Sequence, residues 1–212
     1  MQASSSFQSI GWREETRQLL GRLGFQRGTW LRSSLVHAAV GIAFGFLVPY
    51  QKGADFLDSV ILGAYMCLSV VFAAPAAAAS FESPPGSFKV ALERVVLCVL
   101  YGTLLTFSAM VAGVIVVYAT HTIVVGPDLQ AVGELALFAL MLALAVTSAV
   151  AWMSVRYSPR VGKGTARVIF MGLLLLFFLN VRRLPDVALT GAAISAICAM
   201  ASLLLLWKVQ TR

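Results

Sequence analysis

The sequence predicts an all-α integral membrane protein with six transmembrane helices, preceded by an N-terminal amphipathic interfacial helix, and with both termini cytoplasmic. Apolar side chains make up 59% of the 212 residues and charged ones only 12%, and the mean hydropathy is +0.88. A soluble globule of this size cannot bury that much apolar surface, so the chain needs lipid as solvent. Six long apolar runs and an uneven distribution of Lys and Arg between them complete the prediction.

Residues 1–32 form the first predicted unit, an N-terminal cytoplasmic segment. Its start is polar and lacks the apolar core of a cleaved signal peptide, so we expect it to stay on the protein. From Ile10 to Leu23, apolar residues recur at helical spacing and charged residues take the opposite side. This pattern indicates an amphipathic helix in the headgroup layer, with a soluble helix packed on a partner as the alternative.

Residues 33–212 form the second unit, the transmembrane domain. Its apolar runs lie at about 33–50, 60–79, 95–119, 131–155, 168–181 and 187–207. A bilayer core of roughly 30 Å needs about 17 to 25 helical residues, and all runs but the fifth are long enough. The fifth either extends over residues 165–184 with arginines snorkelling at its ends, or stops short and returns as a hairpin at Pro185.

The positions of Lys and Arg orient these runs. The N-terminal segment, the second loop, the fourth loop and the C-terminus hold five, two, four and two of the 16, against three in the other loops. By the positive-inside rule the richer side is cytoplasmic, which places both termini inside, at a bacterial inner membrane. The net charge of +7 therefore reflects sidedness, and we expect no nucleic-acid partner.

Side chains able to carry out chemistry are few. His37 and His121 fall at opposite faces of the predicted bilayer and cannot share a metal or a proton. The carboxylates lie at the ends of the runs, so no proton relay is visible, and the three cysteines fall inside apolar runs as small fillers. Residues 162–165 lack the glycine spacing of a phosphate-binding loop. We therefore expect no catalytic residue, metal site or cofactor.

The break between the second and third runs, about residues 80–94, is the most structured polar segment. The Pro-Pro-Gly corner forces the chain out of helix, and Ser87 is placed to cap a short new helix whose first turns carry charges. We interpret this segment as a docking elbow on the cytoplasmic side. Its candidate residues are Glu82, Pro84, Pro85, Gly86, Ser87, Phe88, Lys89 and Arg94.

Two further patterns suggest contacts. The fourth loop carries four basic residues that we expect to contact anionic lipid or a cytoplasmic partner, namely Arg156, Arg160, Lys163 and Arg167. Small residues recur every four positions at Gly191, Ser195 and Ala199, which predicts close helix packing either within the chain or between subunits.

The predicted topology and the corner Glu82-x-x-x-Gly86-Ser87-Phe88 resemble the permease subunit of a type-2 ABC exporter. In that family the corner carries a Glu and then a Gly-Thr or Gly-Ser pair, and leads into a short coupling helix that docks on a separate ATPase. Here two prolines precede the glycine, whereas the family usually has a longer charged loop before it and a Pro with basic residues after it. The resemblance also implies an outer re-entrant hairpin, for which the segment from Arg182 to Pro185 is the candidate.

The resemblance implies a transport subunit that is not itself an enzyme. Its partners would be a cytoplasmic ABC ATPase subunit, membrane lipids, and a second copy or a sister permease around a shared pathway. Uncharged polar side chains would line that pathway and suit lipid-like or apolar cargo: Thr103, Thr106, Ser108, Thr147 and Ser148. Two alternatives stay open, a non-transporting membrane scaffold or assembly protein, and an intramembrane enzyme using His37, His121 or Glu134.

Overall fold

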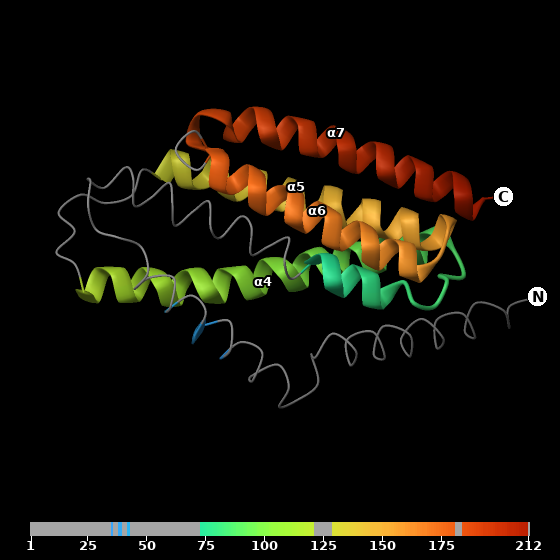
Figure 1. Ribbon diagram of the computed structural model, residues 1–212, viewed down its shortest axis with the longest axis horizontal. Helices are drawn as coiled ribbons and strands as arrows, with labels where there is room; N and C mark the ends of the chain where they lie inside the picture. The colour runs from blue at the N-terminus through green and yellow to red at the C-terminus, as the bar shows by residue number, and fades with distance from the viewer. Residues whose placement is uncertain are drawn as a thin grey trace, which may run out of the picture.

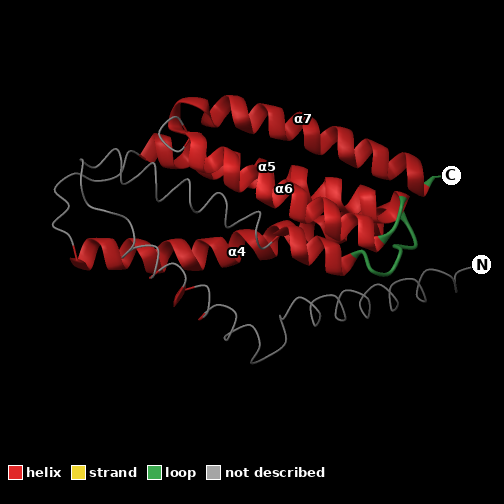
Figure 2. Ribbon diagram, in the orientation of Figure 1, coloured by secondary structure: helices red, strands yellow, loops and turns green. Residues whose placement is uncertain are grey.

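The computed structural model describes positions 35, 38, 39 and 42 and residues 73–120, 129–180 and 184–211. This part of the chain is helical apart from short turns (Figure 2). Beyond the helix at 73–80, it forms α4 (Phe88–Thr120), α5 (Leu129–Arg156), α6 (Pro159–Asn180) and α7 (Leu184–Gln210). The predicted all-helical class is confirmed for these residues. The amphipathic N-terminal helix, nearly all of the first run, most of the second, and both histidines lie outside them.

Helix α4 starts earlier than the third apolar run. It begins directly after Ser87, whose Oγ accepts a hydrogen bond from the Val90 N–H at 3.4 Å, as the sequence predicts for a capping residue. The expected short helix is not separate, because α4 continues without a break for 33 residues. Its length of about 50 Å exceeds the roughly 30 Å of a bilayer core.

Helix α6 begins earlier than the fifth apolar run. It spans 22 residues, about 33 Å, and packs along α5. The expected fourth loop shrinks to Tyr157 and Ser158, because Pro159 takes the first helical position and Ser158 Oγ accepts the Val161 N–H at 3.3 Å. Pro185, expected at a hairpin turn, is the second residue of α7.

Helix α5 is the centre of the bundle and packs against α4, α6 and α7 (Figure 1). Alanines of helix 73–80 complete the core against Cys98 of α4, Val150 of α5 and Ala166 of α6. On α7, Ser195 and Ala199 are buried, and a Cβ on Gly191 would come within 2.8 Å of the Phe138 ring of α5. This small-residue face therefore packs within the chain.

Two of the described segments are long and apolar enough to cross a membrane, Gly133–Arg156 in α5 and Ala188–Gln210 in α7. Large apolar side chains are also exposed on the bundle surface. On α4 they recur every four residues at Leu92, Val96, Leu100 and Leu104. They form a continuous apolar stripe along one face of that helix.

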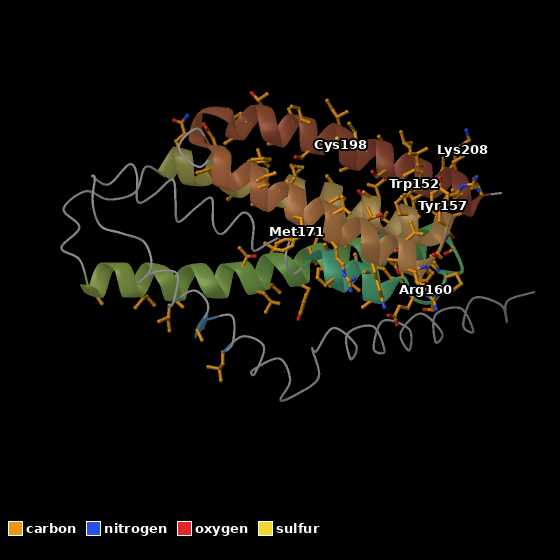
Figure 3. The ribbon with its side chains drawn as sticks, viewed as in Figure 1. Trp152, Tyr157, Arg160, Met171, Cys198 and Lys208 are labelled. Atoms are coloured by element: carbon orange, nitrogen blue, oxygen red, sulfur yellow. The ribbon has the colours of Figure 1, made fainter. Side chains whose placement is uncertain are left out.

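One end of the bundle, here called the elbow end, gathers two turns and the end of a helix. The 81–87 turn, the α5–α6 turn and the C-terminal end of α7 all lie there (Figure 1). Figure 3 places Trp152, Tyr157, Arg160 and Lys208 toward this end, with Met171 and Cys198 further along the helices. The opposite end holds the last turn of α4 and the first turn of α5.

Candidate functional site

The elbow, residues 81–87, is a well-packed turn anchored by Phe81. Helix 73–80 ends with hydrogen bonds from the Phe81 N–H to the Ala77 carbonyl (3.0 Å) and from the Glu82 N–H to the Ala79 carbonyl (3.3 Å). The Phe81 side chain is 1% exposed and packs in a cluster that includes Ala151 of α5 and Leu206 of α7. The prolines that follow prevent the helix from continuing. The turn is therefore fixed from its first residue.

Arg94 holds the elbow from the inside. Its Nη1 donates to the Ser80 carbonyl at 2.9 Å and to the Ser83 carbonyl at 2.8 Å. Its guanidinium lies 5.9 Å from the centre of the Phe81 ring. The side chain is buried at 9% exposure, so these charge-assisted bonds satisfy carbonyls that the end of helix 73–80 leaves unpaired. Arg94 thus fixes the elbow to α4.

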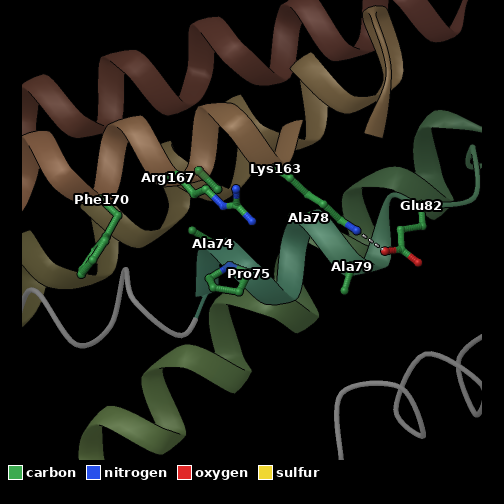
Figure 4. Close-up of a pocket in the computed structure, with 9 residues that line it drawn as sticks. Ala74, Pro75, Ala78, Ala79, Glu82, Lys163, Arg167 and Phe170 are labelled. Atoms are coloured by element: carbon green, nitrogen blue, oxygen red, sulfur yellow. Dashed lines mark hydrogen bonds and ion pairs between the residues drawn. The ribbon is translucent and has the colours of Figure 1, made fainter. Parts of the chain in front are cut away.

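Two other helices also hold the elbow. Lys163 of α6 forms an ion pair with Glu82, with 2.6 Å between Nζ and Oε1 (Figure 4). Gln210 at the end of α7 donates from Nε2 to the Pro85 carbonyl at 3.5 Å. A displacement of the turn would therefore alter its contacts with α4, α6 and α7 together.

The predicted elbow residues divide into an inner and an outer set. Pro85 and Arg94 are buried and Phe88 is half-buried. The others are exposed, and we call four of them the outer rim: Pro84, Gly86, Ser87 and Lys89. A Cβ added to Gly86 would meet nothing within 4 Å. The outer rim is thus accessible to a partner, whereas Pro85 and Arg94 can act only by supporting it.

The four basic residues predicted to contact lipid or a partner are all exposed. Arg156 lies with its guanidinium 5.9 Å from the centre of the Tyr157 ring. Arg160, Lys163 and Arg167 are spaced by three and four along α6 and share one face of it. This spacing places Lys163 against the elbow and Arg167 one turn further along the helix.

The predicted pathway residues bond within their own helices. Thr103 and Thr106 donate to the Val99 and Gly102 carbonyls at 2.8 Å each. Thr147 and Ser148 are fully buried and donate to the Ala143 and Ala145 carbonyls at 2.6 and 3.0 Å. The side chain of Ser108 lies outside the described part. Because two of these residues are enclosed in this conformation, their role in a pathway stays a prediction that requires helix movement.

The ion pair gives a direct test of how the elbow is held. We expect Glu82→Lys to raise amide hydrogen exchange across residues 81–87 several-fold, because it places a second cation against Lys163. Global stability should change by less than about 1 kcal/mol, since both side chains are about half exposed. The reversed pair Glu82→Lys with Lys163→Glu should restore the wild-type exchange rate. Equal exchange in all three proteins would contradict this role.

Sequence reasoning missed the connections of the elbow to α6 and α7. The positive-inside count placed the second and fourth loops on one side, which makes a pair between Glu82 and Lys163 possible but does not select it. No sequence signal indicated Gln210. No protein-family model, curated protein or solved structure matches this chain.

Proposed function

We propose that this chain is the transmembrane subunit of an ATP-driven type-2 ABC exporter, with a separate ATPase bound to the outer rim. The observation that carries the proposal is the two-sided elbow. Its outer rim is exposed at one end of the bundle, its buried side is bonded to α4 and α7, and the exposed Glu82 pairs with α6. Force applied by a partner at the rim would therefore reach three helices at once.

The exposed apolar surface supports membrane placement, and the proposal keeps the six spans predicted from the sequence. The α4 stripe and the exposed apolar residues of α7 include Leu100, Ile197 and Leu204, each at least half exposed. Continuous apolar faces of this kind are unfavourable in water and favourable in lipid. In the proposed assembly these faces contact lipid or a second permease subunit, identical or sister.

The cytoplasmic assignment of the elbow end, and with it of both termini, is supported by charge. The described basic residues gather in the helix turns at this end: Lys89, Arg94, Arg156, Arg160, Lys163, Arg167 and Lys208. Lys and Arg concentrate on the cytoplasmic side of bacterial inner-membrane proteins. A cytoplasmic elbow end is also the side on which an ATPase can bind.

Gly86→Trp tests the proposal most directly, because Gly86 is exposed at the rim and a Cβ there meets nothing within 4 Å. The matched control is Gly133→Trp, which also has nothing within 4 Å but lies in α5 near the opposite end. The measurement is co-purification of ATP hydrolysis with the tagged protein extracted gently from its host. We expect the wild type and Gly133→Trp to retain the ATPase, and Gly86→Trp to lose it about tenfold or more.

The other outcomes separate the alternatives. If no nucleotide-hydrolysing subunit accompanies the wild type, the exporter proposal fails and the non-transporting scaffold becomes the better reading. If both tryptophan variants retain the ATPase equally, a partner exists but does not bind at the rim.

The predicted pathway residues of α4 and α5 indicate which kind of cargo the proposed exporter would carry. Their hydroxyls bond to helix carbonyls and offer no charge to a substrate. A lipid-like or apolar cargo suits such surroundings better than an ion. Saturable, ATP-dependent export of a small charged solute by the reconstituted complex would contradict this part of the proposal.

A further inference from the structure

A groove of about 470 Å³ lies between helix 73–80 and α6, beside the elbow. Its apolar lining includes Pro75, Ala78 and Phe170, and its charged lining is Glu82, Lys163 and Arg167. The groove exists because helix 73–80 presents alanines where larger side chains would fill the space. Its volume falls within the range of sites that bind small ligands.

Polarity changes along the groove. Figure 4 shows Lys163, Arg167 and Phe170 succeeding one another along α6, with Glu82 beyond Lys163 at the elbow. The charged part is therefore nearest the elbow end, where Ala78 and Ala79 form its floor, and the wholly apolar part with Ala74, Pro75 and Phe170 lies further along the bundle. An occupant that fits this order has an anionic head and an apolar tail.

Arg167 is the cation that can receive the head. Lys163 is engaged by Glu82 at 2.6 Å, whereas Arg167 contacts no carboxylate within residues 73–120, 129–180 and 184–211. Its side chain is exposed and lines the groove one turn along α6 from Lys163. A phosphate placed there would gain hydrogen bonds from a guanidinium, which suits phosphate geometry.

We propose that this groove binds one anionic phospholipid, with its phosphate at Arg167 and Lys163 and the start of an acyl chain against Ala74, Pro75 and Phe170. The inference rests on the proposed membrane placement and does not require the ATPase. Glu82 repels the same phosphate and occupies Lys163, so removing its charge should strengthen lipid binding.

The test uses the full-length protein in a neutral detergent, titrated with dioctanoyl phosphatidylglycerol and followed by native mass spectrometry. We expect one bound lipid, binding weakened about fivefold or more by Arg167→Ala, and tighter binding for Glu82→Gln. Arg160→Ala is the matched control, since Arg160 is exposed on the same helix and does not line the groove. It should bind like the wild type. Arg167→Lys should keep much of the affinity.

Comparison ligands separate the sources of affinity. Dioctanoyl phosphatidylcholine should bind more weakly, and glycerol 3-phosphate should not displace the lipid at equal concentration because it lacks the chain. An equal loss of lipid affinity in Arg167→Ala and Arg160→Ala would contradict the proposed site. Equal affinity for the two lipids would contradict it as well. Lipid binding and ATPase co-purification are separate readouts, so failure of this site would leave the docking proposal standing, and the reverse also holds.

Discussion

Arg94→Ala is expected to destabilise the protein by about 2–4 kcal/mol, because the substitution leaves the Ser80 and Ser83 carbonyls without their charged donor. Ser80 is only 2% exposed, so water cannot easily replace the lost bond at its carbonyl. The Phe81 ring also loses the cation that lies 5.9 Å from its centre. The measurement is the midpoint of thermal unfolding at a fixed detergent concentration, together with amide hydrogen exchange across residues 81–87.

Two variants show whether the effect comes from these bonds. Arg160→Ala also removes an arginine at the elbow end, but an exposed one, and should change stability by less than about 0.5 kcal/mol. Arg94→Lys keeps the charge and loses the planar donor group, so its midpoint should fall between those of Arg94→Ala and the wild type. A midpoint for Arg94→Ala equal to that of Arg160→Ala would contradict the clamping role of Arg94.

Loss of the Arg94 contacts should also affect a partner that the residue does not touch. The outer rim is positioned by a turn whose first half Arg94 joins to α4 through the Ser80 and Ser83 carbonyls. If the rim binds an ATPase as proposed, Arg94→Ala should weaken co-purification even though the side chain is buried. Gly86→Trp should weaken it without lowering the unfolding midpoint, which separates a contact residue from a supporting one.

The elbow shows what residue types alone can predict. Proline geometry and the hydroxyl of Ser87 are local properties, so the break and the cap were predictable and the structure has both. The partners of Arg94, Glu82 and Pro85 come from positions between 11 and 125 residues away. Such contacts depend on how the helices pack, which one sequence does not specify.

Helix α6 shows that an apolar run and the helix that contains it need not begin at the same residue. Counting apolar residues placed the start of the fifth run at Val168, because basic residues and two glycines precede it. The helix nevertheless begins at Pro159, since its polar first turns stay at the elbow end while Ala166 packs into the core. Hydropathy measures where a helix can enter lipid, whereas capping by Ser158 and Pro159 determines where it begins.

The contact between Gly162 of α6 and Ser154 of α5 gives the second large expected effect. A Cβ on Gly162 would overlap the Ser154 Oγ and come within 3.2 Å of the Val150 carbonyl oxygen. Gly162→Ala should therefore destabilise the protein by about 1–3 kcal/mol, despite the better helix propensity of alanine. Gly164→Ala, two residues further along, meets nothing within 4 Å and should be neutral or more stable by up to about 1 kcal/mol. Thermal unfolding of the two variants under identical conditions is the measurement.

Ser154 supplies the internal control for this effect. Its Oγ is buried and has no hydrogen-bond partner among the described residues, so Ser154→Ala alone should leave stability unchanged or slightly raise it. Combined with Gly162→Ala, it removes the worst overlap and leaves the Ser154 Cβ at 3.0 Å, which predicts partial rescue. Equal stability of Gly162→Ala and Gly164→Ala would show that α5 and α6 do not cross this closely. Since Lys163 and Arg167 lie on α6 next to this crossing, the positions of the elbow ion pair and the lipid groove depend on the same contact.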